Sequence, residues 1–368
     1  MFQIDRRILT HFDFLIPILV FPIIALSYFL ISEANLALAS KQIVYYGVGV
    51  LVFLLFFMIP LKKIEWVIPF FYWVTILLLL SVDFFGIAKL GARRWLEIPF
   101  VHFTIQPSEI FKPAFILMLA YLIKNNPPEE KGYGWKSFFK LSFYIVLPFL
   151  LIAKEPDLGT AMLLLLLGYG TLFIIGVNKK IWFTLAIIVG CSSPILYNHL
   201  HDYQKQRIKD FISEQPSYHV KQSIIAIGTG GLTGKERSEA TQTHYKFLPI
   251  ATSDFIFAYT VERLGFWGAF ALILCYALLV VHLISLNYML KEDYFTQVIT
   301  TGISLMIFFY MSINIAMTIG LAPVVGVPLP FYSYGGSSFI TFFALFGILE
   351  NLLAFRFDPT YRFIKYSL

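Results

Sequence analysis

The feature of this sequence that most restricts its fold is a series of apolar runs, each about as long as a bilayer is thick, with the charged residues placed between them. We predict that about ten of these runs are membrane-spanning helices. Their ranges are 12–31, 43–59, 66–85, 108–123, 138–153, 158–177, 181–197, 255–284, 295–319 and 339–353. The predicted fold class is therefore an all-α polytopic membrane protein.

The composition agrees with a membrane protein and argues against a soluble domain. Hydrophobic residues make up 58% of the 368 residues and charged residues only 14%, whereas a soluble domain carries roughly a quarter charged residues. The formal net charge of +6 would suggest a nucleic-acid partner if the basic residues were clustered. They are scattered between the apolar runs instead, so we expect no nucleic-acid partner.

The distribution of the basic residues predicts that both termini lie inside the cell. With the N-terminus inside, the short outside loops hold only Lys41, Lys89, Arg93, Arg94 and Lys154. The inside loops and tails hold many more, namely Arg6, Arg7, Lys62, Lys63, Lys124, Lys131, Lys136, Lys140, Lys179, Lys180, Lys291, Arg356, Arg362 and Lys365. The long polar segment 199–253, which precedes the eighth run, is then an extracytoplasmic loop.

In this topology every even-numbered run begins at the outer face, and unusual polar residues stand at those beginnings. They are Glu109 and Lys112 in the fourth run, Asp157 before the sixth, Asp254 before the eighth, and Ser337 and Ser338 before the tenth. We therefore expect these residues to gather on one face of the membrane.

Such a gathering favours binding of an anion. Helix N-termini present free amide donors and a partial positive charge, and several of them together suit a phosphate or pyrophosphate. Carboxylates at the rim could take a proton or hold a cation. The basic side chains that we expect near by are Lys112, Arg93, Arg94 and Arg207. The sequence thus predicts a site for a substrate with a charged headgroup.

Each of the acids also has a purely structural interpretation. Asp254 is well placed as a helix cap, and Asp157 follows a proline as a first-turn acid. Glu109 and Lys112 are three residues apart and could form a neutralising pair. For Lys112 a functional role is the default hypothesis, because ionisable groups inside membrane spans are costly.

Glu262 and Arg263 lie about two turns inside the eighth run. A functional role is the default hypothesis for them too, because they are ionisable groups inside a membrane span. Because adjacent residues on a helix point in different directions, we expect these two side chains to have separate partners.

The glycine-rich stretch at Gly228, Gly230, Gly231 and Gly234 imitates a nucleotide-binding motif. A P-loop would need glycine in place of Thr229, and serine or threonine after Lys235. We therefore expect a flexible outer loop here. The histidines show no metal-ligand spacing.

Six ordered motifs resemble the SEDS family of shape, elongation, division and sporulation proteins, over nearly the whole chain. They are GARRWLEI at 91–98, QPSEIFKPA at 106–114, EPDLGTA at 155–161, QSIIAIGTGGLTGK at 222–235, FLPIATSDFIFAYTVERLG at 247–265 and PFYSYGGSS at 330–338. The short tails are more similar to the rod-shape elongation branch than to the division branch.

The resemblance implies a single membrane domain over 1–368, in the bacterial inner membrane with its active site facing the periplasm. It implies a glycosyltransferase that polymerises lipid II beside a class B penicillin-binding protein and other elongation-complex membrane proteins. The reaction would invert the donor sugar and release undecaprenyl pyrophosphate. No cofactor is required for certain, but a divalent cation (Mg²⁺ or Mn²⁺) is a possible helper.

Matched by position, Asp254 corresponds to the family's essential aspartate, which we expect to act as the general base. Glu109 and Lys112 correspond to its pair in the fourth span, and Asp157 to the acid that opens the sixth. The chain departs from the family pattern at Ile250, Thr252, Ser253, Glu236 and Ala240.

Two other classes of function are compatible with a polytopic protein of this kind. A lipid II flippase would also need intramembrane charges, although through the full membrane depth and often on interrupted helices. A non-catalytic scaffold of the wall-synthesis complex would tolerate loss of Asp254.

Overall fold

The computed structural model describes residues 10–59, 61–89, 92–98, 103–155, 157–198, 205, 209, 211, 217–290 and 293–356. Each of the predicted runs corresponds to one long helix. The helices are α2 (Leu15–Ala34), α3 (Leu36–Met58), α4 (Val67–Phe85), α5 (Pro107–Asn125), α6 (Trp135–Lys154), α7 (Leu158–Ile175), α8 (Lys179–Asn198), α12 (Ile256–Met289), α13 (Tyr294–Thr318) and α14 (Gly336–Ala354). The predicted fold class is confirmed.

Eight of these helices are long and apolar enough to cross a membrane. The other two are α5, which carries Glu109, Lys112 and Lys124, and α8, which begins with two lysines. The molecule is a multi-pass membrane protein.

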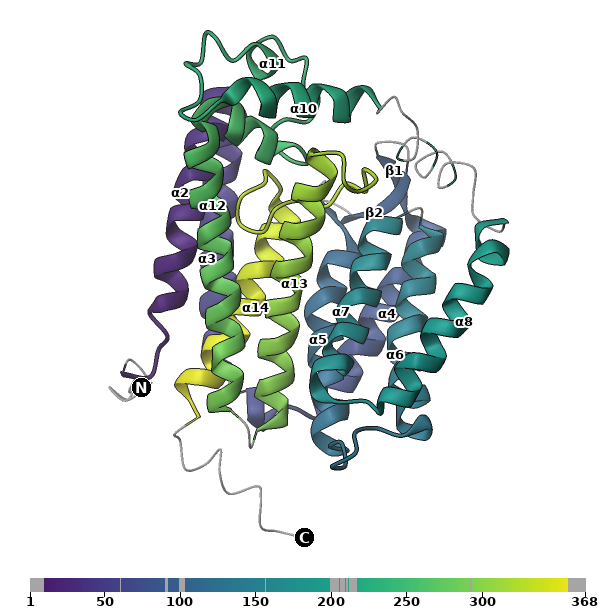
Figure 1. Cartoon of the computed structure of the whole chain (residues 1–368). Coiled ribbons are helices and arrows are strands. Elements are labelled where there is room, and N and C mark those ends of the chain that lie inside the picture. The colour runs from purple at the N-terminus through teal and green to yellow at the C-terminus, as the bar shows by residue number, and fades with distance from the viewer. Residues whose placement is uncertain are drawn as a thin grey trace.

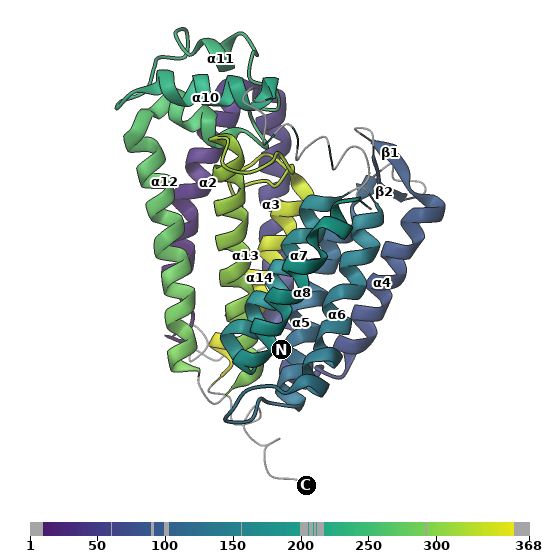
Figure 2. The same cartoon turned by 45° about the vertical axis from the view of Figure 1, so that its right-hand side comes forward.

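The helices form one bundle with two distinct ends. Helix α2 begins and α14 ends at the same end, which we call the terminal end (Figure 1). The opposite end carries the strands β1 and β2 and the helices α10 (Tyr218–Gly230) and α11 (Thr241–His244), and we call it the distal end (Figure 2). Helices α3, α5, α7, α12 and α14 all start at the distal end, so the expected gathering of their N-termini is confirmed.

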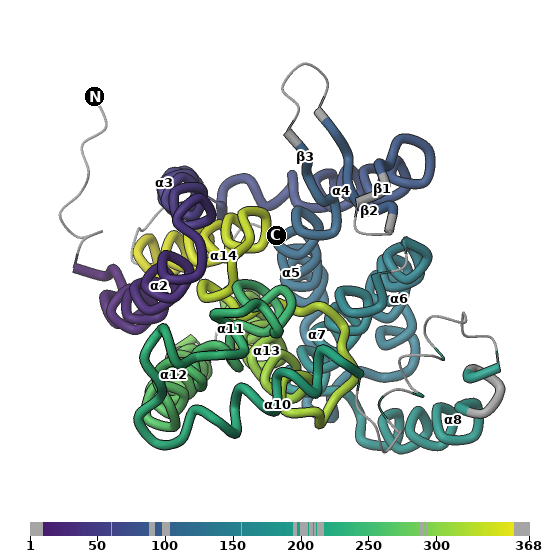
Figure 3. Tube along the Cα trace, turned by 90° about the horizontal axis from the view of Figure 1, so that it is seen from above, coloured from purple at the N-terminus to yellow at the C-terminus, as the bar shows by residue number. Residues whose placement is uncertain are grey.

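The most buried helices are α5, α13 and α14. Helix α14 packs against α3 and α5, while α13 packs against α5, α7 and α12. Seen from above, α8 lies at one edge of the bundle and α2 at another (Figure 3). The outer helices keep many large apolar side chains exposed, as expected where lipid replaces water.

A small antiparallel sheet, which the sequence did not predict, lies between α4 and α5. It consists of β1 (Ile87–Lys89), β2 (Ala92–Ile98) and β3 (Phe103–Ile105), in the order β1-β2-β3. Ile87 pairs with Trp95, and Leu96 pairs with Ile105. Two of the strands have only three residues, which is too short for a recognisable alternation of apolar and polar residues.

The glycine-rich stretch forms the end of a helix and a turn that pack against α12, so the expectation of a flexible outer loop is wrong. Gly228 and Gly230 belong to α10. A Cβ atom on Gly230 would lie 2.1 Å from the Val261 carbonyl oxygen of α12. Gly234 has a positive φ of 81°, and a Cβ atom on it would lie 2.2 Å from the Arg263 carbonyl oxygen. Glycine is therefore needed here because two pieces of backbone approach each other closely.

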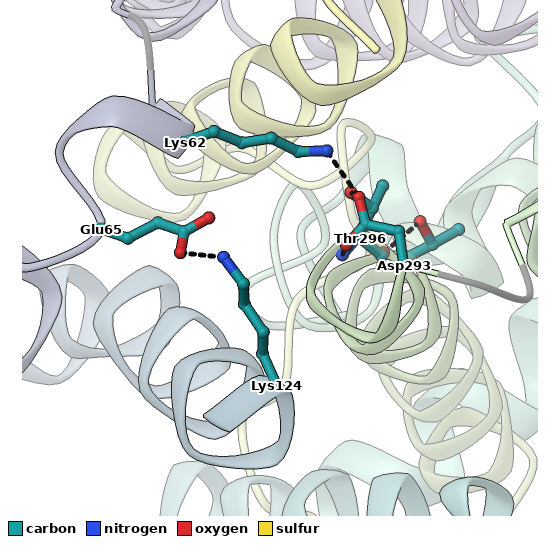
Figure 4. A network of polar contacts seen from close by, with 6 residues as sticks. Lys62, Glu65, Lys124, Asp293 and Thr296 are labelled. Atoms are coloured by element: carbon teal, nitrogen blue, oxygen red, sulfur yellow. Dashed lines mark hydrogen bonds and ion pairs between the residues drawn. The ribbon is translucent and has the colours of Figure 1, made fainter. Parts of the chain in front are cut away.

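At the terminal end, a network of ion pairs joins the short helix η1 (Leu61–Lys63) and its following turn to two long helices (Figure 4). Lys62 Nζ lies 2.6 Å from Asp293 Oδ2, and Thr296 Oγ1 donates to the same oxygen at 2.8 Å. Lys124 pairs with Glu65. These contacts tie the α3–α4 connection to α5 and to the start of α13.

Candidate active site

Lys112 and Glu109 form a buried ion pair near the start of α5. Lys112 Nζ lies 2.5 Å from Glu109 Oε1, and the residues are 1% and 7% exposed. The same Nζ lies 5.0 Å from the centre of the Tyr310 ring on α13. The expected pairing is confirmed. Each charge depends on the other, because an unpaired charge in this apolar environment would be strongly destabilising.

Asp157 caps α7 and also joins two neighbouring elements. Its Oδ1 accepts a hydrogen bond from Thr160 N at 3.3 Å, so its structural interpretation as a helix-terminal acid is confirmed. Its Oδ2 accepts a hydrogen bond from Gln106 Nε2 at 3.3 Å, and Arg94 Nη1 lies 3.6 Å from Oδ1. The residue therefore connects β2, the start of α5 and the start of α7.

The other predicted anion-binding residues do not all lie beside the acids described above. Arg93 is exposed and precedes Arg94 on β2, where neighbouring side chains point to opposite faces. The structure brings Arg94, and not Arg93, to Asp157. Ser337 and Ser338 lie in the first turn of α14 and are partly buried. Arg207 lies outside the described residues.

Asp254 precedes α12, with its carboxylate directed at the connection between α13 and α14. The alternative interpretation of Asp254 as the helix cap is not supported, since the N-cap residue of α12 is Phe255. Asp254 Oδ1 accepts a hydrogen bond from Ser253 Oγ at 3.1 Å. A Cβ atom on Gly326 would lie 3.5 Å from Oδ2. Asn314 Nδ2 donates to the Asp254 carbonyl oxygen at 3.0 Å, which fixes the backbone at this position.

Residues 319–335, which we call the α13–α14 connection, hold the Asp254 segment from one side. Ser333 Oγ donates to the Ser253 carbonyl oxygen at 2.7 Å. Tyr334 N donates to the Thr252 carbonyl oxygen at 2.8 Å. Thr252 and Ser253 are two of the departures from the family pattern, and each contacts this connection through its backbone carbonyl.

The α13–α14 connection also contacts α7, and helix α14, which follows it, contacts α5. Gly159 of α7 lies so close to Val325 that a Cβ atom would be 2.5 Å from the Val325 carbonyl oxygen. Thr341 Oγ1, one turn into α14, donates to the Glu109 carbonyl oxygen at 3.2 Å. The start of α7 and the Asp254 segment thus contact the α13–α14 connection, and the start of α5 contacts the first turns of α14.

Glu155, to which the sequence assigned no role, is a buried acid beside this site. It is 4% exposed, and neither carboxylate oxygen has a hydrogen-bond partner among the described residues. Burial, together with the negative charges of Asp157 and Asp83, raises the pKa of Glu155 to about 8. The side chain is therefore largely protonated at neutral pH.

Glu262 and Arg263 do have separate partners, as predicted. Glu262 is fully buried and accepts hydrogen bonds from Gln242 N at 2.8 Å and from Thr243 N at 3.1 Å, which holds α11 on α12. Arg263 forms two hydrogen bonds with Glu33 at the end of α2, at 2.9 and 2.7 Å. Both residues stabilise the distal end.

Sequence reasoning missed Asn314 and Tyr310, which lie within an apolar run. Asn314 Nδ2 donates to both Asp254 O and Val327 O, and Tyr310 covers Lys112. A buried asparagine inside a membrane span is itself a signal, so Asn314 could have been found. Nothing in the sequence separated Tyr310 from the many other aromatic residues.

The groups at this end of the bundle are chemically suited to anion binding and to proton transfer. Lys112 and Arg94 provide cations on α5 and β2, each beside an acid. Asp254 provides a partly buried carboxylate on a fixed backbone. Within the described part of the chain, no three His, Cys, Asp or Glu side chains are grouped to hold a metal ion. A bound cation would therefore need oxygen ligands from the substrate as well.

The fold and this site define a polytopic helical membrane protein with a group of charged residues at one end of its bundle. The sequence profile of the FtsW/RodA/SpoVE family, described as cell cycle protein, matches residues 3–357. The chain therefore belongs to the FtsW/RodA/SpoVE family, which confirms the resemblance seen in the motifs.

Relatives in this family cover nearly the full chain. The peptidoglycan glycosyltransferase MrdB of Helicobacter pylori is 55% identical over 354 residues, covering 96% of this chain and 93% of that protein. The MrdB protein of Escherichia coli is 37% identical over 333 residues, covering 88% of each.

Two solved structures share the fold. One is a chain from a peptidoglycan synthase complex described as coordinating polymerization and crosslinking. It has a TM-score of 0.81 and 24% identity, covering 94% of this chain and 99% of that chain. The other is the crystal structure of the rod shape determining protein RodA of Thermus thermophilus. It has a TM-score of 0.71 and 23% identity, covering 94% of this chain and 98% of that chain.

Proposed function

We propose that this chain is a peptidoglycan glycosyltransferase that polymerises lipid II into glycan strands during cell elongation. The 55% identity to a protein named for this activity supports the reaction class. The observation that carries the assignment is that the Asp254 segment and the start of α7, which Asp157 caps, both contact the α13–α14 connection, while Glu109 contacts the first turns of α14 directly after it. This arrangement suits a substrate with a sugar on one side and a pyrophosphate on the other.

Asp254 acts as the general base in this proposal. A sugar hydroxyl attacks the anomeric carbon of the donor while its proton passes to the Asp254 carboxylate. The bond from the anomeric carbon to the pyrophosphate oxygen breaks, and undecaprenyl pyrophosphate leaves with the electron pair. A single displacement inverts the anomeric centre and needs no enzyme nucleophile. The hydrogen bond from Ser253 to Oδ1 orients the carboxylate.

Lys112 and Arg94 stabilise the negative charge that develops on the leaving pyrophosphate. Both are already held by acids, Glu109 and Asp157, so little reorganisation is needed when the substrate binds. Arg93, Arg207, Ser337 and Ser338 remain proposed substrate-binding residues.

A divalent cation such as Mg²⁺ or Mn²⁺ fits beside this pyrophosphate. Asp157 and the neighbouring Glu155 would be the protein ligands, with Glu155 losing its proton when the cation binds; both oxygens of buried Glu155 have no hydrogen-bond partner within the described ranges. These residues would hold the cation together with pyrophosphate oxygens. The cation would neutralise charge on the leaving group.

The distal end faces the periplasm in this proposal, with both termini in the cytoplasm. The terminal end carries Lys62, Lys124, Lys136 and Lys179 on its connections, as the positive-inside rule requires. A class B penicillin-binding protein is the proposed partner. The structural similarity to a chain from a complex that coordinates polymerization and crosslinking supports this pairing.

The test is glycan chain formation by the purified protein with its partner, from lipid II supplied directly. We expect Asp254→Asn to reduce the rate of polymerisation by a factor of about 10² to 10⁴, which is the usual contribution of a general base. Glu239→Gln, an exposed acid at the same end, is the control and should remain active. A flippase or a scaffold would form no glycan chains under these conditions. Near-normal activity of a folded Asp254→Asn variant would exclude the base assignment.

A further inference from the structure

A cavity of about 280 Å³ lies at the distal end, beside the candidate active site and separate from the Lys112 pair. Its walls come from the turn between α2 and α3, the segment around α11 and the first turns of α12. The basic residues that line it include Arg237, His244 and Lys246. All three are exposed, so the cavity is accessible from outside the bundle. Its size suits a headgroup rather than a whole lipid-linked sugar.

The cavity carries an excess of positive charge. Arg263 in its wall is neutralised by Glu33, at 2.7 and 2.9 Å. Among the described carboxylates, none forms an ion pair with Arg237 or Lys246. Two cations around one cavity, without an ion pair among the described residues, favour an anionic occupant.

The wall of the cavity is held in an uncommon backbone conformation. Lys246 has φ 59° and Ile250 has φ 53°, although β-branched residues rarely adopt positive φ. The segment between them is fixed, because Leu248 N donates to Gln242 O at 2.8 Å and buried Glu262 holds α11 in place. Strain of this kind persists where the surrounding structure enforces it, often at ligand sites.

Apolar side chains are exposed at this cavity and next to it: Ile250 lines it, and Leu36 and Tyr245 follow lining residues directly in the chain. Leu36, Tyr245 and Ile250 are all more than half exposed. Exposed aliphatic and aromatic side chains at the end of a membrane bundle belong at the lipid interface. The occupant therefore carries its negative charge on a headgroup and its apolar chain in the membrane.

The cavity wall continues directly to the proposed base. Thr252 lines the cavity, and its carbonyl oxygen accepts the hydrogen bond from Tyr334 N. Ser253 follows and bonds to the Asp254 carboxylate. A headgroup in the cavity thus lies beside the segment that positions Asp254.

We propose that this cavity binds the pyrophosphate of the acceptor, the second lipid-linked sugar. The inference rests on the proposed function, because polymerisation joins two lipid-linked sugars and each carries a pyrophosphate. The departing pyrophosphate is at Lys112 and Arg94. The pyrophosphate that the acceptor retains needs a second cationic site, and Arg237 and Lys246 supply it.

The test compares two double variants by native mass spectrometry in phosphatidylcholine nanodiscs, with undecaprenyl pyrophosphate as the probe. We expect two bound probe molecules for the unmodified protein and one for Arg237→Gln/Lys246→Gln. Lys41→Gln/Lys221→Gln removes two exposed lysines of the same end that do not line the cavity, and it should still bind two. The Arg237 and Lys246 side chains are exposed, so their neutral replacements should leave the fold intact.

Competition distinguishes the possible sources of the anion. We expect inorganic pyrophosphate and phosphatidylglycerol to displace the cavity-bound probe at least about tenfold more weakly than unlabelled undecaprenyl pyrophosphate does. Equal displacement by inorganic pyrophosphate would make this a soluble-anion site. Equal displacement by phosphatidylglycerol would make it a general anionic-lipid site. Either result, or two probe molecules bound to the Arg237→Gln/Lys246→Gln variant, would overturn the proposal.

A kinetic measurement separates this inference from the function it rests on. The Arg237→Gln/Lys246→Gln variant should have a KM for lipid II about tenfold higher, because one or two charge-assisted contacts are lost. Its kcat should change little. Asp254→Asn should lose polymerisation but still bind two probe molecules. If Asp254→Asn remained active, the base assignment would fail, while the binding count would still decide the cavity.

Discussion

At the scale of single residues, two cations of the distal end are each held by a specific acid. Lys112 pairs with Glu109, which the three-residue spacing predicted. Arg263 pairs with Glu33, a residue 230 positions away in the sequence. Spacing reveals only partners on the same helix, whereas partners on other helices become visible only in the folded chain.

Exchanging the charges of Lys112 and Glu109 tests whether the pair does more than neutralise itself. We expect the variant Glu109→Lys/Lys112→Glu to fold, because the buried pair is preserved, yet to lose polymerisation because the cation has moved. Lys112→Ala alone should destabilise the protein by about 3–5 kcal/mol, since Glu109 is left unpaired. Thermal unfolding and glycan synthesis measure the two effects. Recovered synthesis in the exchanged variant would show that the pair is structural only.

Glu155 should make the stability of the protein depend on pH. Its pKa is about 8 in the folded protein and about 4.5 when exposed. At a pH between these two pKa values, Glu155 is deprotonated in the unfolded chain but still protonated in the folded protein. Stability should therefore fall as pH rises, by up to about 1.4 kcal/mol per pH unit, and level off above pH 8.

The measurement for Glu155 is thermal unfolding of Glu155→Gln and unmodified protein at several pH values, with EDTA present. The variant should match the unmodified protein near pH 4 and become more stable than it as the pH approaches 8. A constant difference at all pH values would contradict the raised pKa.

At the scale of elements, close backbone packing decides how the distal end is assembled. Helix α10 crosses α12 where Gly230 meets Val261, and the following turn meets Arg263 at Gly234. The sequence showed only a group of glycines, which a loop would also contain. The helical part was missed because glycine lowers helix propensity, while the contact that requires glycine comes from a distant segment.

Two alanine substitutions in α10 test this packing. Gly230→Ala should destabilise the protein by about 1–3 kcal/mol, because its Cβ would overlap the Val261 carbonyl and force α10 away from α12. Gly228→Ala is the control on the same helix, with nothing within 4 Å of its Cβ. It should be neutral or stabilising by up to about 1 kcal/mol. Equal effects in a denaturation experiment would contradict the close approach.

At the scale of the whole molecule, the bundle brings the starts of alternate spans to one end. This follows from the connectivity, since successive membrane spans must run in opposite directions. The apolar runs therefore predicted both the helices and the gathering of polar residues at their starts. What they did not predict is the α13–α14 connection, which contacts both the Asp254 segment and the start of α7.

Accessibility labelling tests the proposed orientation of the bundle. With Cys191 and Cys275 replaced by serine, single cysteines at Lys221 on α10 and at Lys136 on α6 mark the distal and terminal ends. A membrane-impermeant maleimide should label the Lys221→Cys variant in cells whose inner membrane is intact. It should label Lys136→Cys only after that membrane is opened. The reverse pattern would place the reaction centre in the cytoplasm.

The sequence alone determined the helices, the grouping of Glu109, Asp157 and Asp254 at one end, and the family. Bilayer thickness sets the length of every apolar run, and the cost of buried charge confines ionisable groups to a few positions. Only the tertiary structure decided which acid is a cap, which arginine reaches Asp157 and where the cavity at Arg237 and Lys246 forms. Those outcomes depend on contacts between segments that are distant in the chain, and no local pattern encodes such contacts.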